Sequence, residues 1–363
     1  MLTALLVIAI LVVLIVAHEL GHFIAAKILG VRVKEFGVGY PPRAFTFGKI
    51  GETEYSLNWI PFGGFVRLFG DEGEGQRGPG TFVDAHRGVQ AAILVAGVAM
   101  NAVAAWALFA VALHLGVPQQ VQVAAPNQEV HLVISDVVPG SPADSAGVAP
   151  GDEILAVSDN KGVSLKTLTP DAVVDFVKSR GGKPISISYV HAGATSTATM
   201  TPANAVLRDA AGRPALGIAL VLIANTSESW SDASVHALAL TRSAFKSVAA
   251  ELWGLVRGAL RGAPDLSDIV GPVGIVDYVG DASQHGMGLV VRLAALISVN
   301  LAIINLIPIP ALDGGRLLIL GIEAVMRREA PHLVVQVLNA LGIGLIIVLM
   351  FVVTYHDLAR LFA

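Results

Sequence analysis

The sequence Ala17-His18-Glu19-Leu20-Gly21-His22-Phe23 decides how the rest of the chain is interpreted, because it places two imidazoles and a carboxylate inside an apolar segment. That segment runs from residue 2 to residue 29 and has no other ionisable side chain before Lys27. On a helix, His18 and His22 share one face with their β-carbons roughly 6 Å apart, which suits two ligands of one metal ion. A carboxylate near the middle of a spanning helix costs about 2.5–3.5 kcal/mol on insertion scales, so its presence indicates a polar site.

The spacing matches H-E-x-x-H, the signature of zinc metalloproteases, in which two neutral imidazoles hold Zn²⁺ and the glutamate takes a proton from the metal-bound water. We therefore predict that His18 and His22 bind zinc and that Glu19 is the catalytic base. A polar cluster that only packs against other helices is the alternative. The apolar setting favours catalysis, because lipid penalises such residues where they have no polar site to line.

The composition predicts a membrane protein. Hydrophobic residues make up 54% of the 363 positions and charged residues only 14%, whereas a soluble globular chain carries about 25% charged residues. The net charge of −4 and the lack of any Lys/Arg-rich run argue against a nucleic-acid partner. Because the chain has no cysteine, thiolate zinc sites are excluded and a metal must use histidine and carboxylate ligands.

Four segments are long and apolar enough to span a bilayer: 1–29, 89–116, 287–310, and 333–363 with its tail. The first lacks the basic residues that begin a secretory signal peptide, so we expect it to be retained as a spanning helix. In the second, small residues near Gly97 and the amide of Asn101 predict close helix packing with one interhelical hydrogen bond.

Residues 30–88, between the first two spans, predict a membrane-associated β-hairpin, with β-like runs at 44–47 and 53–59. Such a hairpin can lie at membrane depth only where protein covers its backbone or water lines it. We expect its free edge at Gly64, Phe65 and Val66 to bind an extended substrate strand. An ordinary hairpin outside the membrane fits the same pattern.

Residues 117–229 are soluble in composition, and residues 139–155 read P-x-S-P-A-x-x-A-G-x-x-x-G-D-x-I-L. This pattern resembles PDZ domains of bacterial membrane-associated proteases. The resemblance implies that extended peptide chain ends bind there by strand addition, with a structural spacer as the alternative. Residues 230–286 predict amphipathic helices, lying either on the membrane or the helical core, or packed within the soluble domain.

A zinc ion held by two histidines needs a third protein ligand besides water. The extended H-E-x-x-H-x-x-G-x-x-H form is absent, because Ala25 and Ile28 occupy its later places. The best candidate is Asp313, at the start of an expected loop over 311–332. Prolines at 308 and 310 break the preceding helix and two glycines follow, so the carboxylate can be presented at a bend.

Together these motifs resemble the bacterial site-2 proteases, the intramembrane zinc metalloproteases of regulated intramembrane proteolysis. The resemblance covers nearly the whole chain and also includes residues 63–66, 271–275 and the N-x-x-P-x-P-x-x-D-G sequence from Asn305. It implies zinc ligation by His18, His22 and Asp313, acid–base catalysis by Glu19, and substrate handling by Asn305. One departure is Gly-Val at 97–98, where many members have Gly-Pro before the asparagine.

The expected fold is therefore an α-helical polytopic membrane protein with four transmembrane helices. A membrane-associated β-hairpin follows the first helix, and an α+β PDZ domain lies between the second and third. Arginines at 316, 327 and 328 follow the third span, whereas the N-terminus has neither Lys nor Arg. By the positive-inside rule, we expect the catalytic site to face the cytoplasm and the PDZ domain to be extracytoplasmic. The resemblance implies that the membrane is the bacterial cytoplasmic (inner) membrane.

The expected function is hydrolysis of peptide bonds in or near the transmembrane segments of single-pass membrane proteins already trimmed on the outer side. Anti-sigma factors and signal-peptide remnants are the substrates that the resemblance implies. A divalent metal transporter is one rival, although it would need ligands on several spans and repeated halves. A catalytically inactive PDZ membrane scaffold is the other, against which the intact His18, Glu19, His22 and Asp313 argue.

Overall fold

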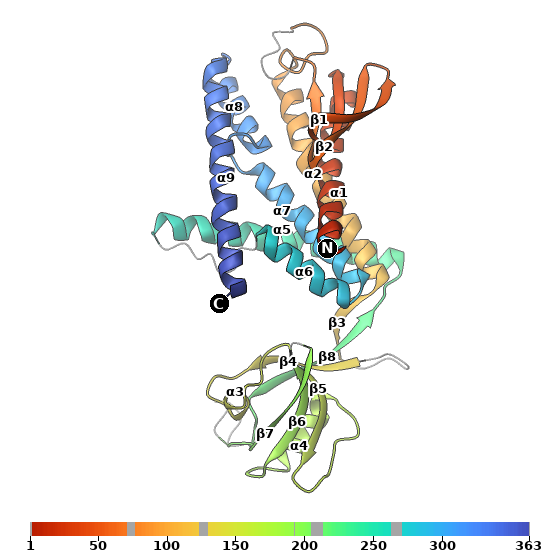
Figure 1. Cartoon of the computed structure of the whole chain (residues 1–363), viewed down its shortest axis with the longest axis vertical. Coiled ribbons are helices and arrows are strands. Elements are labelled where there is room, and N and C mark those ends of the chain that lie inside the picture. Colours follow the sequence, from red (N-terminus) through yellow and green to blue (C-terminus); the bar gives the residue numbers. More distant parts are fainter. Residues whose placement is uncertain are drawn as a thin grey trace. The chain divides into compact units, whose positions relative to one another are not determined.

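The computed structural model describes residues 2–70, 77–122, 130–191, 193–204, 213–262 and 271–362. Parts of the expected segments 30–88, 117–229 and 230–286 thus lie outside the described residues. The chain divides into two compact units, one formed by Met1–Leu115 with Glu228–Ala363 and the other by Gly116–Ser227 (Figure 1).

The first unit contains the apolar helices. Within the described residues, four helices are long and apolar enough to cross a membrane, in agreement with the composition. They are α1 (Leu2–Ile28), α2 (Arg87–Leu115), α7 (Met287–Leu306) and α9 (His332–Phe362). Helix α2 packs between α1 and α7, whereas α9 buries little of its surface. The apolar surface that α9 leaves exposed suits contact with lipid.

A glycine allows α1 and α2 to approach closely. A β-carbon added at Gly21 would lie 2.8 Å from both the carbonyl carbon of Ala96 and the β-carbon of Met100. Any larger residue would therefore force the two helices apart, as at other small-residue crossings in membranes. This crossing sits directly beside His22.

The hairpin consists of β1 (Val33–Ile50) and β2 (Thr53–Leu68), so its strands are longer than the short runs expected from the sequence. Phe36 pairs with both Val66 and Tyr55, which places the first half of β1 between the two halves of β2. Its base packs into a core with α1, α2 and α8. Large apolar side chains stay exposed at the outer part of the hairpin, among them Phe45, Phe47 and Trp59.

The expectation of a loop over 311–332 is wrong, because this segment contains helix α8 (Asp313–Met326). Its apolar residues recur at helical spacing, and Leu317 and Leu320 pack into the core shared with α1, α2 and the hairpin. The bend predicted from the prolines is therefore short. It lies between α7 and α8 and leaves Asp313 as the first residue of a new helix.

Residues 230–286 form α5 (Trp230–Leu260) and α6 (Pro272–Gln284). Helix α5 packs on α2 and α7 and runs across their direction (Figure 1). The indole Nε1–H of Trp106 on α2 donates a hydrogen bond to the carbonyl of Ser234 on α5. Of the two placements open at the sequence level, α5 thus belongs with the apolar unit and not with the soluble one.

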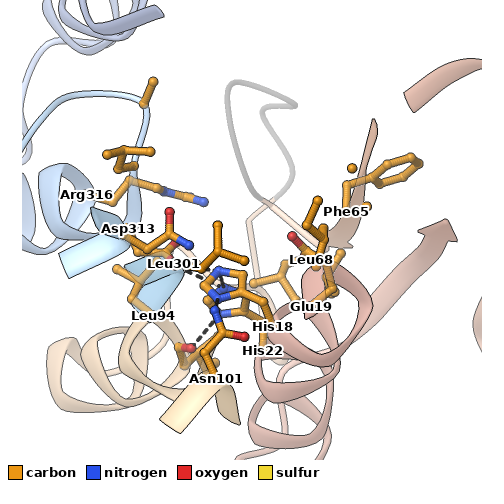
Figure 2. A pocket seen from close by; sticks show the side chains of 18 of the residues that line it. His18, Glu19, His22, Phe65, Leu68, Leu94, Asn101, Leu301, Asp313 and Arg316 are labelled. Carbon is orange, nitrogen blue, oxygen red and sulfur yellow. Dashed lines mark hydrogen bonds and ion pairs between the residues drawn. The ribbon is translucent and has the colours of Figure 1, made fainter. Parts of the chain in front are cut away.

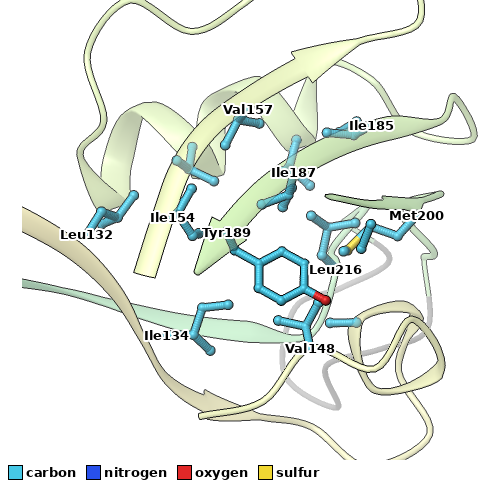
Figure 3. Packing of buried hydrophobic residues seen from close by; sticks show 14 of the residues in the cluster. Leu132, Ile134, Val148, Ile154, Val157, Ile185, Ile187, Tyr189, Met200 and Leu216 are labelled. Atoms are coloured by element: carbon cyan, nitrogen blue, oxygen red, sulfur yellow. The ribbon is translucent and has the colours of Figure 1, made fainter. Parts of the chain in front are cut away.

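The second unit is a six-stranded sheet in the order β3-β8-β4-β5-β6-β7. Its strands are β3 (Val117–Val121), β4 (Val130–Val137), β5 (Glu153–Asp159), β6 (Ile185–His191), β7 (Ala194–Met200) and β8 (Ile218–Thr226). Side chains such as Ile134, Ile154 and Ile187 form its core together with α4 (Pro170–Lys178) (Figure 3). In the motif at 139–155, Ser141 caps the short helix α3 (Pro142–Ser145) by accepting a hydrogen bond from the amide of Asp144.

We predict that Asp357 anchors α9 to α6. Its buried carboxylate accepts hydrogen bonds from the backbone amides of Gly271, at 3.0 Å, and Gly274, at 2.9 Å, and so caps α6 from another helix. Asp357→Ala should lower the free energy of unfolding by about 1–2 kcal/mol, as for other lost helix caps. Thermal unfolding in detergent measures the loss, with Tyr355→Phe at an exposed position of α9 as the control. Equal stability of both variants would contradict the anchoring role.

Candidate metal centre

Helices α1 and α8 bring the side chains of His18, His22 and Asp313 to one point (Figure 2). The Oδ2 atom of Asp313 lies 3.0 Å from Nε2 of His18 and 3.2 Å from Nε2 of His22. The two Nε2 atoms are themselves 3.1 Å apart. Three potential ligand atoms from distant parts of the sequence therefore face one another across a space suited to a single ion.

The chain between α7 and α8 explains how Asp313 reaches this point. Helix α7 ends at Leu306, and Ile307 and Leu312 have extended backbones on either side of the two prolines. A β-carbon at Gly315 would lie 2.6 Å from the carbonyl carbon of Ile309. A glycine is therefore required there for α8 to fold back against the break and start at Asp313.

The potential ligand atoms of His18, His22 and Asp313 fit a zinc ion. Asp313 Oδ2 is buried and has no hydrogen bond of good geometry, although two imidazole nitrogens are close to it. Nδ1–H of His22 donates to the carbonyl of Ile93 at 2.8 Å, so the lone pair of Nε2 is directed at the cluster. Two imidazoles and a carboxylate, with no thiolate, form a ligand set found in catalytic zinc sites.

Electrostatics keep the Asp313 carboxyl ionised. Burial alone would raise its pKa, but the imidazoles of His18 and His22, when they carry a proton on Nε2, outweigh burial and hold the pKa well below its ordinary value. An ionised carboxylate is the form that binds a metal cation.

Glu19 lines the same cavity, whose volume is about 490 Å³. Its carboxylate faces the backbone of Val66 on β2. A β-carbon at Gly64 would lie 3.1 Å from Cγ of Glu19, so the strand packs directly on the glutamate. Gly64, Phe65, Val66 and Asn305 line the cavity as well. The structure thus brings together every residue that the sequence placed in the site.

Helix α2 supplies two further residues whose contact with the site the sequence did not reveal. A β-carbon at Gly97 would lie 2.6 Å from Cε1 of His22 and 2.8 Å from Cε1 of His18. Asn101, expected only to join helices, has its amide nitrogen 3.3 Å from Nδ1 of His18. The four-residue spacing of Gly97 and Asn101 on one helix face is the signal that could have indicated a surface fitted to the two imidazoles.

The chain is similar to known proteins over nearly its whole length. The family described as Peptidase family M50 matches residues 6–349. A Clostridium perfringens protein described as a zinc metalloprotease is 32% identical over 347 residues, and the match covers 95% of each chain. The zinc metalloprotease RasP of Geobacillus kaustophilus is 26% identical over 428 residues, covering 96% of each. Among solved structures, the PDZ domain of an SdrC-like protein from Listeria monocytogenes is 23% identical and gives a TM-score of 0.21. The match covers 28% of this chain and 93% of the Listeria chain.

We predict that Gly97→Ala disrupts metal binding, because the added methyl group would overlap both imidazoles. The variant should lose most of the zinc found in the purified wild-type protein, as measured by elemental analysis. Gly321→Ala on α8 is the matched control, since a β-carbon there meets nothing within 4 Å. Wild-type zinc content in Gly97→Ala would show that α2 does not constrain the imidazoles.

Proposed function

Because the chain belongs to peptidase family M50, the site-2 protease family of zinc metalloproteases, we propose that it hydrolyses peptide bonds in or near the transmembrane segments of single-pass membrane proteins. Zn²⁺ is the cofactor expected of a member of this family. The observation that carries the proposal is the convergence of three ligand atoms from α1 and α8 in a cavity that also contains Glu19.

His18, His22 and Asp313 hold the zinc ion in this proposal. When bound, zinc supplies a Lewis acid that polarises the scissile carbonyl and lowers the pKa of water. Glu19 acts as general base toward the attacking water and then returns the proton to the leaving amine. Its position supports this role, because it lies beside the ligand cluster and borders the strand where a substrate would lie.

Substrate binding is proposed to use the edge of β2. Residues 64–68 pair with the first half of β1 on one side, and among the described residues no strand pairs with their other side. A substrate helix must lose its own backbone hydrogen bonds before it is cut, and these groups need new partners in an apolar surrounding. Strand pairing with Gly64, Phe65 and Val66 would supply them, while Asn305 offers an amide to the same chain.

The unit Gly116–Ser227 is proposed to be the PDZ domain that the motif at 139–155 implies. Strand β3 pairs with residues 222–226 of β8, whereas residues 218–221 of β8 pair only with β4 among the described strands. The backbone edge at 218–221 is therefore available to an extended chain end. Binding there would select chains already trimmed on the outer side.

We propose an inner-membrane location with the metal site toward the cytoplasm and the PDZ domain outside. Arg316, Arg327 and Arg328, on α8 and directly after it, support this orientation through the positive-inside rule. Anti-sigma factors and signal-peptide remnants are the proposed substrate classes. A metal transporter receives no support, because the described residues contain a single ligand cluster of His and carboxylate groups and not a path of several.

We predict that Glu19→Gln abolishes cleavage without removing zinc. Loss of a general base costs typically 10²–10⁴-fold in rate, so cleavage of a single-pass test substrate should fall by at least about 100-fold, while zinc content stays near that of the wild type. Glu251→Gln, at an exposed position of α5, should cleave normally. Normal cleavage by Glu19→Gln would refute the proposed mechanism, and loss of zinc from this variant would show that Glu19 is structural.

A proline in the second half of β2 should slow cleavage without removing zinc. Phe65→Pro disturbs the backbone of residues 64–66 at this edge, and each substrate hydrogen bond lost, worth about 1.4 kcal/mol, corresponds to a tenfold change in rate. Phe47→Pro makes the same change in the exposed outer part of the hairpin and should leave the rate unchanged. Equal rates for both variants and the wild type would contradict substrate pairing with β2.

A further inference from the structure

The side chain of Asn101 has an unsatisfied polar atom next to a predicted zinc ligand. Asn101 lies on α2 and is 0% exposed. Its amide nitrogen faces Nδ1 of His18 at 3.3 Å, and its carbonyl Oδ1 is buried without a hydrogen-bond partner. A buried amide with an orphaned oxygen is costly, by about 1–3 kcal/mol, and calls for an explanation.

Zinc binding through Nε2 would determine which ring nitrogen of His18 carries the proton. A neutral imidazole has one N–H group, so with Nε2 on the metal the proton resides on Nδ1, which then needs an acceptor. His22 already follows this rule, since its Nδ1–H donates to the carbonyl of Ile93. The NH₂ group of Asn101 can only donate, so its present orientation suits a His18 that has its proton on Nε2.

The geometry points to a specific role for Asn101, and this inference rests on the proposed zinc ligation by His18. We propose that Asn101 is a positioning residue, which turns its amide by half a rotation when zinc binds and accepts the Nδ1–H of His18 on Oδ1. The rotation exchanges two atoms of similar size and leaves the packing almost unchanged. It gives the Nδ1–H of His18 an acceptor and so holds the ring with Nε2 toward the metal.

Neighbouring contacts hold Asn101 in place for this role. The hydroxyl of Ser298 on α7, itself 0% exposed, donates to the backbone carbonyl of Asn101 at 2.8 Å. One turn earlier on α2, Gly97 touches both imidazoles. The two histidines are thus oriented differently: His22 by a backbone carbonyl that no substitution removes, and His18 by a side chain that can be replaced.

The test measures the zinc dissociation constant of the full-length protein in detergent by competition with a chelator. Asn101→Leu keeps the size of the side chain but removes the acceptor, and should weaken zinc binding by about 10–100-fold, as for other lost partners of metal-bound histidines. Asn101→Asp keeps an acceptor oxygen and should bind zinc as the wild type does. Wild-type affinity in Asn101→Leu would overturn the inference, whereas a wild type that binds no zinc would overturn the proposed function itself.

Gln90→Leu is the matched control for general destabilisation. Gln90 is a buried amide on the same helix, but it donates to the carbonyls of Val83 and Ala85, away from the histidines. It should lower thermal stability and leave the zinc affinity unchanged. If Gln90→Leu weakened zinc binding as much as Asn101→Leu, the effect would be one of folding and the positioning role would be wrong.

A spectroscopic test does not require Asn101→Leu to fold. In the zinc-loaded protein labelled with ¹⁵N-histidine, Nδ1 of His18 should carry the proton, and Asn101→Asp should move the resonance of this N–H downfield through a stronger, charge-assisted hydrogen bond. The resonance of the His22 Nδ1–H should stay where it is. An unchanged His18 resonance would show that residue 101 does not accept its proton.

Discussion

The approach of the Asp313 carboxylate to the imidazoles of His18 and His22 is the interaction on which the rest of the apolar unit depends. All three groups are polar, and lipid or apolar protein around them would make each one expensive alone. In the proposed site they are stabilised as a set, because together they share one cation. The break between α7 and α8, the glycines after Asp313 and the tight crossing of α1 on α2 all serve to bring this set together.

Helix α2 forms one side of the site, and strand β2 of the hairpin forms another. On α2, Gly97 leaves room for the two imidazoles because it has no side chain. The backbone carbonyl of Ile93 accepts a hydrogen bond from His22, and the side-chain amide of Asn101 lies beside His18. On the opposite side, β2 touches Glu19 through Gly64 and the backbone of Val66. A peptide chain lying along β2 would therefore run next to the proposed base, which links substrate binding and proton transfer in one small region.

Much of this site could be predicted from the sequence, because ionisable residues are rare in membrane-spanning segments and indicate a polar site where they occur. His18, Glu19 and His22 stand out in an apolar run, and the prolines before Asp313 mark a bend. The contacts of Gly97 and Asn101 with the imidazoles depend on how two helices cross, which periodicity does not give. Helix α8 is not predicted for a related reason. Two prolines and two glycines indicate a loop, but Leu317 and Leu320 pack against α1 and α2, and this packing stabilises a helix.

The most direct test of the account is X-ray absorption at the zinc edge of an Asp313→Cys variant. The natural chain has no cysteine, so a thiolate near the metal could come only from position 313. A zinc–sulfur distance of about 2.3 Å, with imidazole nitrogens at about 2.0–2.1 Å, is the predicted result, and the wild-type protein should show the nitrogens without sulfur. Zinc bound at full occupancy in the variant with no sulfur neighbour would mean that residue 313 is not a ligand, and that α1 and α8 do not share one metal ion.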